Sequence, residues 1–173
     1  MVAVVPDGAK SIDRERPGRL MMRLAALLAA NAALCASPAT AQRAQISDLS
    51  DVNFGIVTNL AADASRTQDI CVYSQTDVYN VRAFGDGAGG AFTLSSGANT
   101  LSYEVQWNST AGRTAGTTLT ANTALTGQPS SARQRNCNQG PSASLIIVLR
   151  SAALSSATAG SYTGTLTLVV APE

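Results

Sequence analysis

The stretch 159–173, AGSYTGTLTLVVAPE, constrains the fold more than any other part of this chain. Apolar and small residues fall on one side of an extended backbone there, and mostly threonines on the other. The first set is Tyr162, Gly164, Leu166, Leu168 and Val170, and the second is Thr163, Thr165, Thr167 and Val169. This alternation predicts a half-buried β-strand that stops near Pro172, which has no backbone N–H to donate. A neighbour at the free edge of this strand is expected from earlier in the chain or from another molecule.

The N-terminal part is typical of a secretory signal. Residues 1–23 hold Lys10 and four arginines, the Ala/Leu run 24–34 follows, and small residues precede Gln42. A basic region, an apolar core and a small-x-small site predict export and cleavage after Ala41, and the apolar run is too short to cross a bilayer of about 30 Å. The expected organisation is a leader over 1–41, starting at Met1, Met21 or Met22, and one domain over 42–173.

Two of the three cysteines, Cys71 and Cys137, remain after such cleavage. In an oxidising compartment they allow one intramolecular disulfide, which would stabilise the fold by about 4 kcal/mol. A zinc site is not supported, because the chain has no histidine and only these two thiols. Cys35 allows a lipid anchor as a weaker alternative, since Leu34 before it fits a lipoprotein signal poorly.

Short alternating or apolar segments between Gly-, Asn- and Ser-rich turns predict an all-β sandwich. The expected strands are 46–57, 69–75, 78–84, 91–94, 101–107 and 144–150, with short edge strands near 117–120 or 123–125 and a small-residue connection over 154–159. Residues 69–75 and 78–84 are expected to pair as a hairpin. In 101–107 the inward, core-facing positions are expected to be Leu101, Tyr103, Val105 and Trp107. The run 144–150, SLIIVLR, is expected to be central and covered on both faces.

Little in this sequence indicates catalysis. The glycine-rich stretch 85–90 could be taken for a phosphate loop, but no helix start follows it, so it is interpreted as a hairpin turn. Histidine is absent, and lysine is absent after residue 41. No catalytic, cofactor-binding or metal-binding residue is therefore assigned, and the net charge of +1 gives no argument for nucleic acid. A hydrolase would need two carboxylates facing one cleft, and nothing points to such a pair.

Several short motifs together resemble the spore coat protein U domain, found in Csu-type subunits of archaic chaperone-usher pili. The similarity spans residues 46–170. The motifs are Phe54-Gly55 in DVNFG, Cys71-Val72-Tyr73-Ser74, the strand start Leu101-Ser102-Tyr103, Cys137 before an apolar strand, and the ending from Gly160 to Leu168.

The resemblance implies an immunoglobulin-like sandwich that lacks its final strand. The hydrophobic groove left open would be filled first by a periplasmic chaperone and then by a strand of a neighbouring subunit, with assembly through an outer-membrane usher. The expected acceptor groove consists of Phe54, Ile147, Tyr162, Leu166, Leu168 and Val170. The chain would then be a structural or adhesive pilus subunit, exported through the periplasm to the cell surface.

Two questions stay open at this stage. Residues 46–54 are either a donated strand or an in-domain strand, and DVNFG favours the second, because it matches the in-domain strand of the family. An accepting but non-donating subunit would belong at the tip or act as a terminating unit. The alternative to the pilus hypothesis is a self-complete secreted β-sandwich, such as a coat or carbohydrate-binding protein, that does not polymerise.

Overall fold

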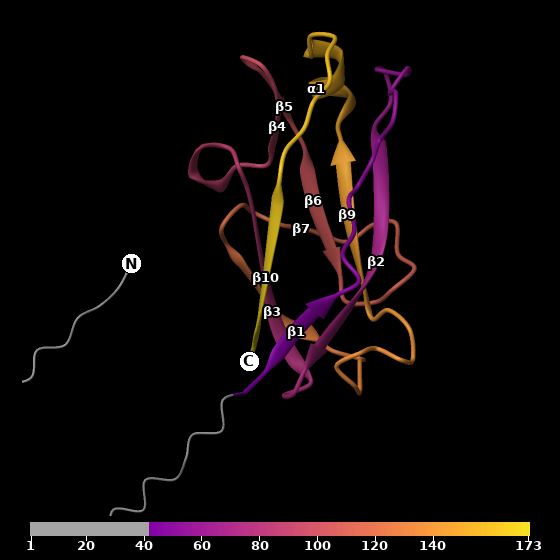
Figure 1. Cartoon of the computed structure of the whole chain (residues 1–173), viewed down its shortest axis with the longest axis vertical. Coiled ribbons are helices and arrows are strands. Elements are labelled where there is room, and N and C mark those ends of the chain that lie inside the picture. The colour runs from indigo at the N-terminus through magenta and orange to yellow at the C-terminus, as the bar shows by residue number, and fades with distance from the viewer. Residues whose placement is uncertain (1–41) are drawn as a thin grey trace, which may run out of the picture. The chain divides into compact units, whose positions relative to one another are not determined.

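The computed structural model of this chain describes residues 42–173, so the expected leader and its cleavage site lie outside the described part. The described part is an antiparallel all-β sandwich with one short α-helix and one 3₁₀ turn (Figure 1). Its strands are β1 (Ala44–Ser47), β2 (Ala64–Ser74), β3 (Val78–Gly85), β4 (Thr93–Ser96), β5 (Asn99–Ser102), β6 (Glu104–Asn108), β7 (Thr117–Thr118), β8 (Ala124–Pro129), β9 (Ala143–Leu149) and β10 (Leu166–Pro172).

The strand order identifies the type of sandwich. One sheet has the order β1-β2-β9-β6-β7, a second has the order β10-β3-β8, and β4 pairs with β5 in a small third sheet. The series β1, β2, β9 and β6 matches strands A, B, E and D of an immunoglobulin sandwich, and β3 and β10 match C and F. Strand G of a complete immunoglobulin fold would pair with F, but among residues 42–173 no strand lies outside β10. Residues 42–173 therefore form an immunoglobulin-like sandwich in which no strand occupies the position of G.

The core lies between the two main sheets, and β9 is its central strand. Every residue of β9 is buried, and its apolar run pairs with β2 on one side and β6 on the other, as expected for SLIIVLR. Trp107 and Tyr79 contribute the largest fully buried side chains. The alternation expected over 101–107 also holds, because Leu101, Tyr103, Val105 and Trp107 are all buried. The strand itself is divided at Tyr103 into β5 and β6.

The predicted strand over 46–57 is mostly wrong. β1 ends at Ser47 because Asp48 adopts a φ of 65°, which turns the chain out of the extended conformation. Gly55 has a φ of 65° as well, which bends the segment a second time. Residues 48–63 therefore form no strand, and β2 begins earlier than expected, at Ala64.

Two predicted hairpins are also wrong. Strands β2 and β3 lie in different sheets, and the turn between them crosses the sandwich. The Ser74 hydroxyl donates a 2.7 Å hydrogen bond to the Val78 carbonyl, and Asp77 adopts a φ of 60°, so this turn is held locally rather than by pairing of the strands. The glycine-rich stretch ends in the 3₁₀ turn Ala88–Gly90 and joins β3 to β4, again between two sheets.

The small-residue connection before the last strand contains a helix that the sequence analysis did not predict. Helix α1 (Ser151–Ser156) spans six residues and buries Leu154. None of the helices in the described part is long and apolar enough to cross a membrane. The expected edge strands appear as β7 and β8, and β8 extends further than expected, to Pro129.

Candidate functional site

The outer edge of β10 is the main candidate site. β10 pairs with β3 in antiparallel register from Leu166↔Gly85 to Pro172↔Tyr79, and no strand of residues 42–173 pairs with its other edge. The Glu173 amide donates to the Val78 carbonyl at 3.2 Å, which shows which residues of β10 face β3. Because bonded and non-bonded pairs alternate in an antiparallel ladder, the backbone groups of Leu166, Leu168 and Val170 point to the free edge.

The same three residues turn their side chains toward the core. Leu166, Leu168 and Val170 are partly buried, whereas Thr167 and Val169 are exposed. All six residues of the predicted acceptor groove belong to one hydrophobic cluster: Ile147 is buried in it, and Phe54, Tyr162, Leu166, Leu168 and Val170 pack partly buried against it. Tyr162 precedes β10, and its hydroxyl donates a 2.8 Å hydrogen bond to the Thr158 carbonyl. The structure thus places these six residues in a single hydrophobic cluster.

The segment 48–63 borders the same core. Its residues Phe54 and Val57 pack partly buried against the cluster, and Val52 is partly buried as well. No backbone-to-backbone hydrogen bond joins residues 48–63 to the rest of the described part. Side chains attach the segment instead. Arg66 of β2 donates to the carbonyls of Asn53 (3.2 Å) and Phe54 (3.4 Å), and its guanidinium lies 5.7 Å from the centre of the Phe54 ring. At the end of the segment, Asp63 accepts a 2.7 Å hydrogen bond from Arg150.

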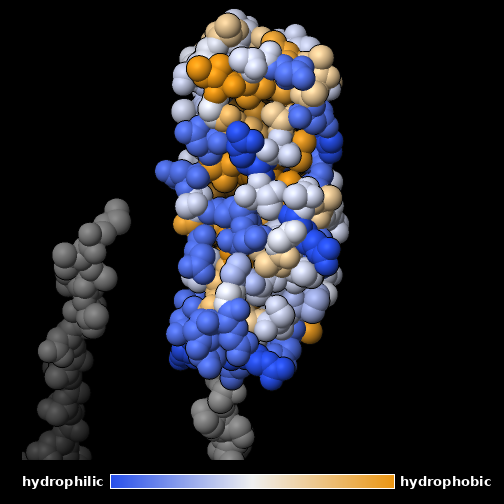
Figure 2. All heavy atoms as spheres, turned by 90° about the vertical axis from the view of Figure 1, so that its right-hand side faces the viewer, coloured by the Kyte–Doolittle hydropathy of each residue, from blue (hydrophilic) through white to orange (hydrophobic). Residues whose placement is uncertain are grey.

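This segment also carries most of the exposed large apolar side chains of the described part. They are Ile56 (92% exposed), Leu49 (47%) and Leu60 (45%). In Figure 1 the chain after β1 runs toward the end of the molecule that carries α1, and Figure 2 shows hydrophobic surface gathered at that end of the face. Exposed apolar side chains gathered in one segment are typical of an interaction surface.

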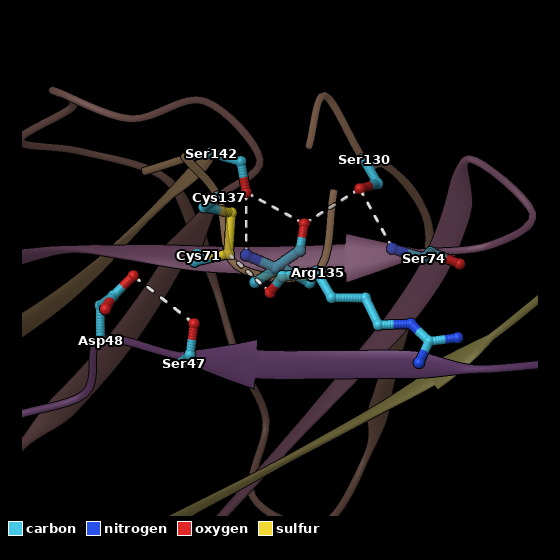
Figure 3. The surroundings of a disulfide bond; sticks show 9 residues. Ser47, Asp48, Cys71, Ser74, Ser130, Arg135, Cys137 and Ser142 are labelled. Carbon is cyan, nitrogen blue, oxygen red and sulfur yellow. Dashed lines mark hydrogen bonds between the residues drawn. A yellow bond between two sulfur atoms is a disulfide. The ribbon is translucent and has the colours of Figure 1, made fainter. Parts of the chain in front are cut away.

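The predicted disulfide is confirmed. Cys71 on β2 is bonded to Cys137, with the two Cα atoms 5.8 Å apart. Figure 3 shows that serines fasten the same loop to β2: the Ser142 and Ser130 hydroxyls donate to the Val72 carbonyl at 3.0 and 2.9 Å. β9 pairs with β2 only as far as Ile70, so at Val72 these two hydroxyls supply the hydrogen bonds that a neighbouring strand would otherwise form. The loop 130–142 is therefore held against β2 by covalent and polar contacts together.

Two carboxylates, those of Asp63 and Glu104, lie close together because both form an ion pair with Arg150. Arg150 lies 2.7 Å from Asp63 and 2.7 Å from Glu104. A backbone hydrogen bond from Ser151 and the Arg150 side chain lower the pKa of Asp63, and hydrogen bonds from Arg150 and Gln106 lower that of Glu104. A glycosidase acid needs a raised pKa, so this pair lacks the proton donor that a hydrolase would use. Among the described residues no group of His, Cys, Asp and Glu could hold a metal ion.

A hollow lies where β10 ends beside the start of β1. Its volume is about 470 Å³, and it is lined by Gln42, Arg43, Ala44, Gln45, Tyr73, Arg135, Val170, Ala171 and Pro172. From the sequence, Arg133 and Arg135 are expected to keep their loop soluble, with a recognition patch as the alternative, and Arg43 has no expected role. Arg43 and Arg135 are 92 residues apart in the sequence, so no local pattern could predict that they line the same hollow.

The chain was compared with protein families, curated proteins and solved structures. No family model and no curated protein matches this chain. A solved structure described as a chaperone-tip adhesin complex in CFA/I fimbriae biogenesis is similar in part, with 16% sequence identity and a TM-score of 0.49. The similarity covers 77% of this chain and 42% of that one, so the present chain corresponds to less than half of that protein.

Proposed function

We propose that this chain is a structural or adhesive subunit of a surface pilus that accepts a β-strand from another polypeptide along β10. Its partners would be a periplasmic chaperone, an outer-membrane usher and neighbouring subunits. The route of assembly would be donor-strand complementation after export through the periplasm. The motifs that resemble the spore coat protein U domain support this proposal, and so does the sandwich without a strand beside β10.

The observation that carries the proposal is the combination of two features on the same three residues. The backbone groups of Leu166, Leu168 and Val170 face an edge with which no described strand pairs, and their side chains pack against the core. A strand added there would form backbone hydrogen bonds and bury apolar surface at the same time. Each extra buried CH₂ group contributes about 0.8 kcal/mol, so an occupant with alternating apolar side chains is favoured over a polar one.

The position of β1 supports an accepting role. Residues Ala44–Ser47 pair with Cys71–Ser74 of β2, so they are part of this sandwich rather than a strand offered to a neighbour. Asn53 and Phe54, within DVNFG, are attached to the same β2 strand through Arg66. We therefore propose a tip or terminating position, in which the subunit accepts a strand and does not donate residues 46–54.

The proposal is tested by complementation with a peptide. The full chain is exported to the periplasm of a bacterial host that makes no other pilus proteins. The purified protein is then unfolded by heat and followed by circular dichroism. The probe is a peptide of about nine residues that alternates valine and threonine. The control peptide has the same composition with the valines grouped together.

We expect marginal stability without a peptide. The alternating peptide at about 100 times its Kd should add about 2.7 kcal/mol, and the control peptide should add much less. For a domain of this size that corresponds to a rise in Tm of about 10 °C. A soluble, cooperatively unfolding monomer whose Tm changes with neither peptide would contradict the proposal and favour the self-complete sandwich.

A further inference from the structure

We propose that the hollow between the end of β10 and the start of β1 binds a carboxylate carried by the incoming strand. This inference rests on the proposed function and specifies the chemistry of the partner. The partner would be an extended polypeptide with alternating apolar residues and an Asp or Glu at the end that reaches β1. The hollow adjoins the open edge directly, because Val170, Ala171 and Pro172 form part of its wall.

The lining of this hollow is positively charged. Arg43 and Arg135 both line it, and no carboxylate does. Neither arginine forms an ion pair within residues 42–173, where both ion pairs involve Arg150. The nearest acidic residue in sequence to the β10 wall is Glu173, whose carboxylate accepts a 2.8 Å hydrogen bond from the Gly127 amide in β8. The two guanidinium groups thus remain available to an acidic group from outside.

Pro172 explains why a side chain matters at this point. The residues of β10 that face the free edge continue in the series 166, 168, 170 and 172. Leu168 and Val170 each offer an N–H to an added strand, but Pro172 has none. The backbone ladder therefore loses a donor where the hollow begins. Guanidinium N–H groups next to this position can supply donors to a carboxylate instead.

Arg135 is held in place by the loop that the disulfide fastens. Cys137, two residues further on, is bonded to Cys71 of β2. Figure 3 shows the Arg135 side chain extending from this loop along β1. Arg43 directly precedes β1, and its carbonyl accepts a 2.9 Å hydrogen bond from the Gln75 amide. Both arginines therefore start from anchored backbone, which favours recognition over a freely moving surface charge.

The test compares acidic and neutral probes on the full chain. The probes are alternating Val/Thr peptides with blocked ends, carrying one Asp at either the N-terminal or the C-terminal end, and matching peptides with Asn. Binding is measured by fluorescence anisotropy for the wild type, Arg43→Gln, Arg135→Gln and the double variant. Arg133→Gln is the matched control, because Arg133 is an exposed arginine of the same loop that does not line the hollow.

We expect one Asp peptide to bind about tenfold more tightly than its Asn counterpart. Each single variant should lose about three- to fivefold of that advantage and the double variant nearly all of it, in keeping with partly exposed ion pairs. Arg133→Gln should behave like the wild type, and all variants should bind the Asn peptide equally, which shows that the fold is intact. High salt should reduce the Asp advantage.

The results separate this inference from the proposed function. If Asp and Asn peptides bind equally well, or if Arg133→Gln has the same effect as Arg135→Gln, the carboxylate site is wrong while strand acceptance stands. If no alternating peptide binds at all, the proposed function fails and the carboxylate site fails with it.

Discussion

The indole Nε1 of Trp107 donates a 3.2 Å hydrogen bond to the hydroxyl of Tyr79 across the sandwich. Trp107 lies on β6 in one sheet and Tyr79 on β3 in the other, and each side chain is only 1% exposed. Their rings pack edge to face with centroids 6.2 Å apart. The pair therefore joins the two sheets, and Tyr79 lies on β3, the strand that pairs with β10.

The first prediction concerns this pair. Tyr79→Phe keeps the ring but leaves the buried indole N–H without its partner, so the free energy of unfolding should fall by about 1–3 kcal/mol. Urea unfolding measures the change. Tyr73→Phe is the control, because Tyr73 is only partly buried and lies outside this contact, and its effect should stay within about 0.5 kcal/mol. Equal losses in both variants would show that the Tyr79 hydroxyl has no special role.

The second prediction concerns the disulfide. Replacing Cys71 and Cys137 by serine should cost about 4 kcal/mol of stability on the chain-entropy model, because a 67-residue loop is released in the unfolded state. Chemical denaturation in the presence and absence of reductant measures the difference. Thiol labelling under denaturing, non-reducing conditions should leave both residues unmodified in the wild type. Peptide mapping that finds label on both would contradict the bond.

The third prediction concerns alkaline pH. Burial raises the pKa of Tyr79 to about 12, and burial together with the Asp86 charge raises that of Tyr103 to about 12. A raised pKa in the folded state means that stability is fully present below the ordinary value of 10 and is lost as pH rises from 10 to about 12. Urea midpoints measured from pH 8 to 12 should fall over that window. Tyr103→Phe should make the fall shallower, and an unchanged slope would refute the assignment.

Sequence reasoning found the elements whose signal is local. The five apolar residues of β9 predicted a central strand, and the alternation from Leu166 to Val170 predicted the inward face of β10. Trp107 was correctly expected in the core for the same reason. The period-2 pattern of a strand depends only on neighbouring residues, so it can be recognised without knowing the tertiary contacts.

Pairing partners could not be predicted in the same way. The turn at Thr76-Asp77 is compatible with a hairpin or with a crossing between sheets, and side-chain bonds from Ser74 select the crossing. β1 was predicted too long because the positive φ of Asp48 leaves no mark on the apolar alternation. Helix α1 was missed because Ser151–Ser156 contains only serine, alanine and one leucine, a composition also common in loops.

The candidate site was predictable to the extent that it is apolar. The alternating pattern predicts the inward positions of Leu166, Leu168 and Val170, whereas no local pattern predicts a site at Arg43 and Arg135. The two arginines line the same hollow because the disulfide at Cys137 and the serine bonds of the loop 130–142 hold that loop against β2, next to β1. Contacts that depend on long loops are invisible to any local pattern.

The fourth prediction concerns acidic pH. The pKa values of Asp63 and Glu104 lie below their ordinary values of 3.8 and 4.5, for Asp63 mainly through the Ser151 amide and for Glu104 mainly through Arg150. A lowered pKa contributes stability that is present above the ordinary value and lost as pH falls through the folded value. The wild type should therefore exceed Arg150→Gln in stability at pH 6, with the difference shrinking below about pH 4. A constant difference from pH 6 to 2 would contradict this linkage.

The fifth prediction separates the two faces of β10. Leu168 is partly buried against the core, and Val169 beside it is 45% exposed on the other face. Leu168→Asp places a charge where an added strand would pack, so peptide stabilisation should be abolished, whereas Val169→Asp should leave it within about twofold. Because Leu168→Asp also disturbs the core, Leu168→Ala provides a milder variant, for which a loss of about 2 kcal/mol or more in basal stability is expected. Peptide affinity measured for the folded fraction of each variant then decides the matter. If Val169→Asp weakens binding as strongly as Leu168→Ala, the occupant does not lie on the inward face of β10, and strand addition at this edge is wrong.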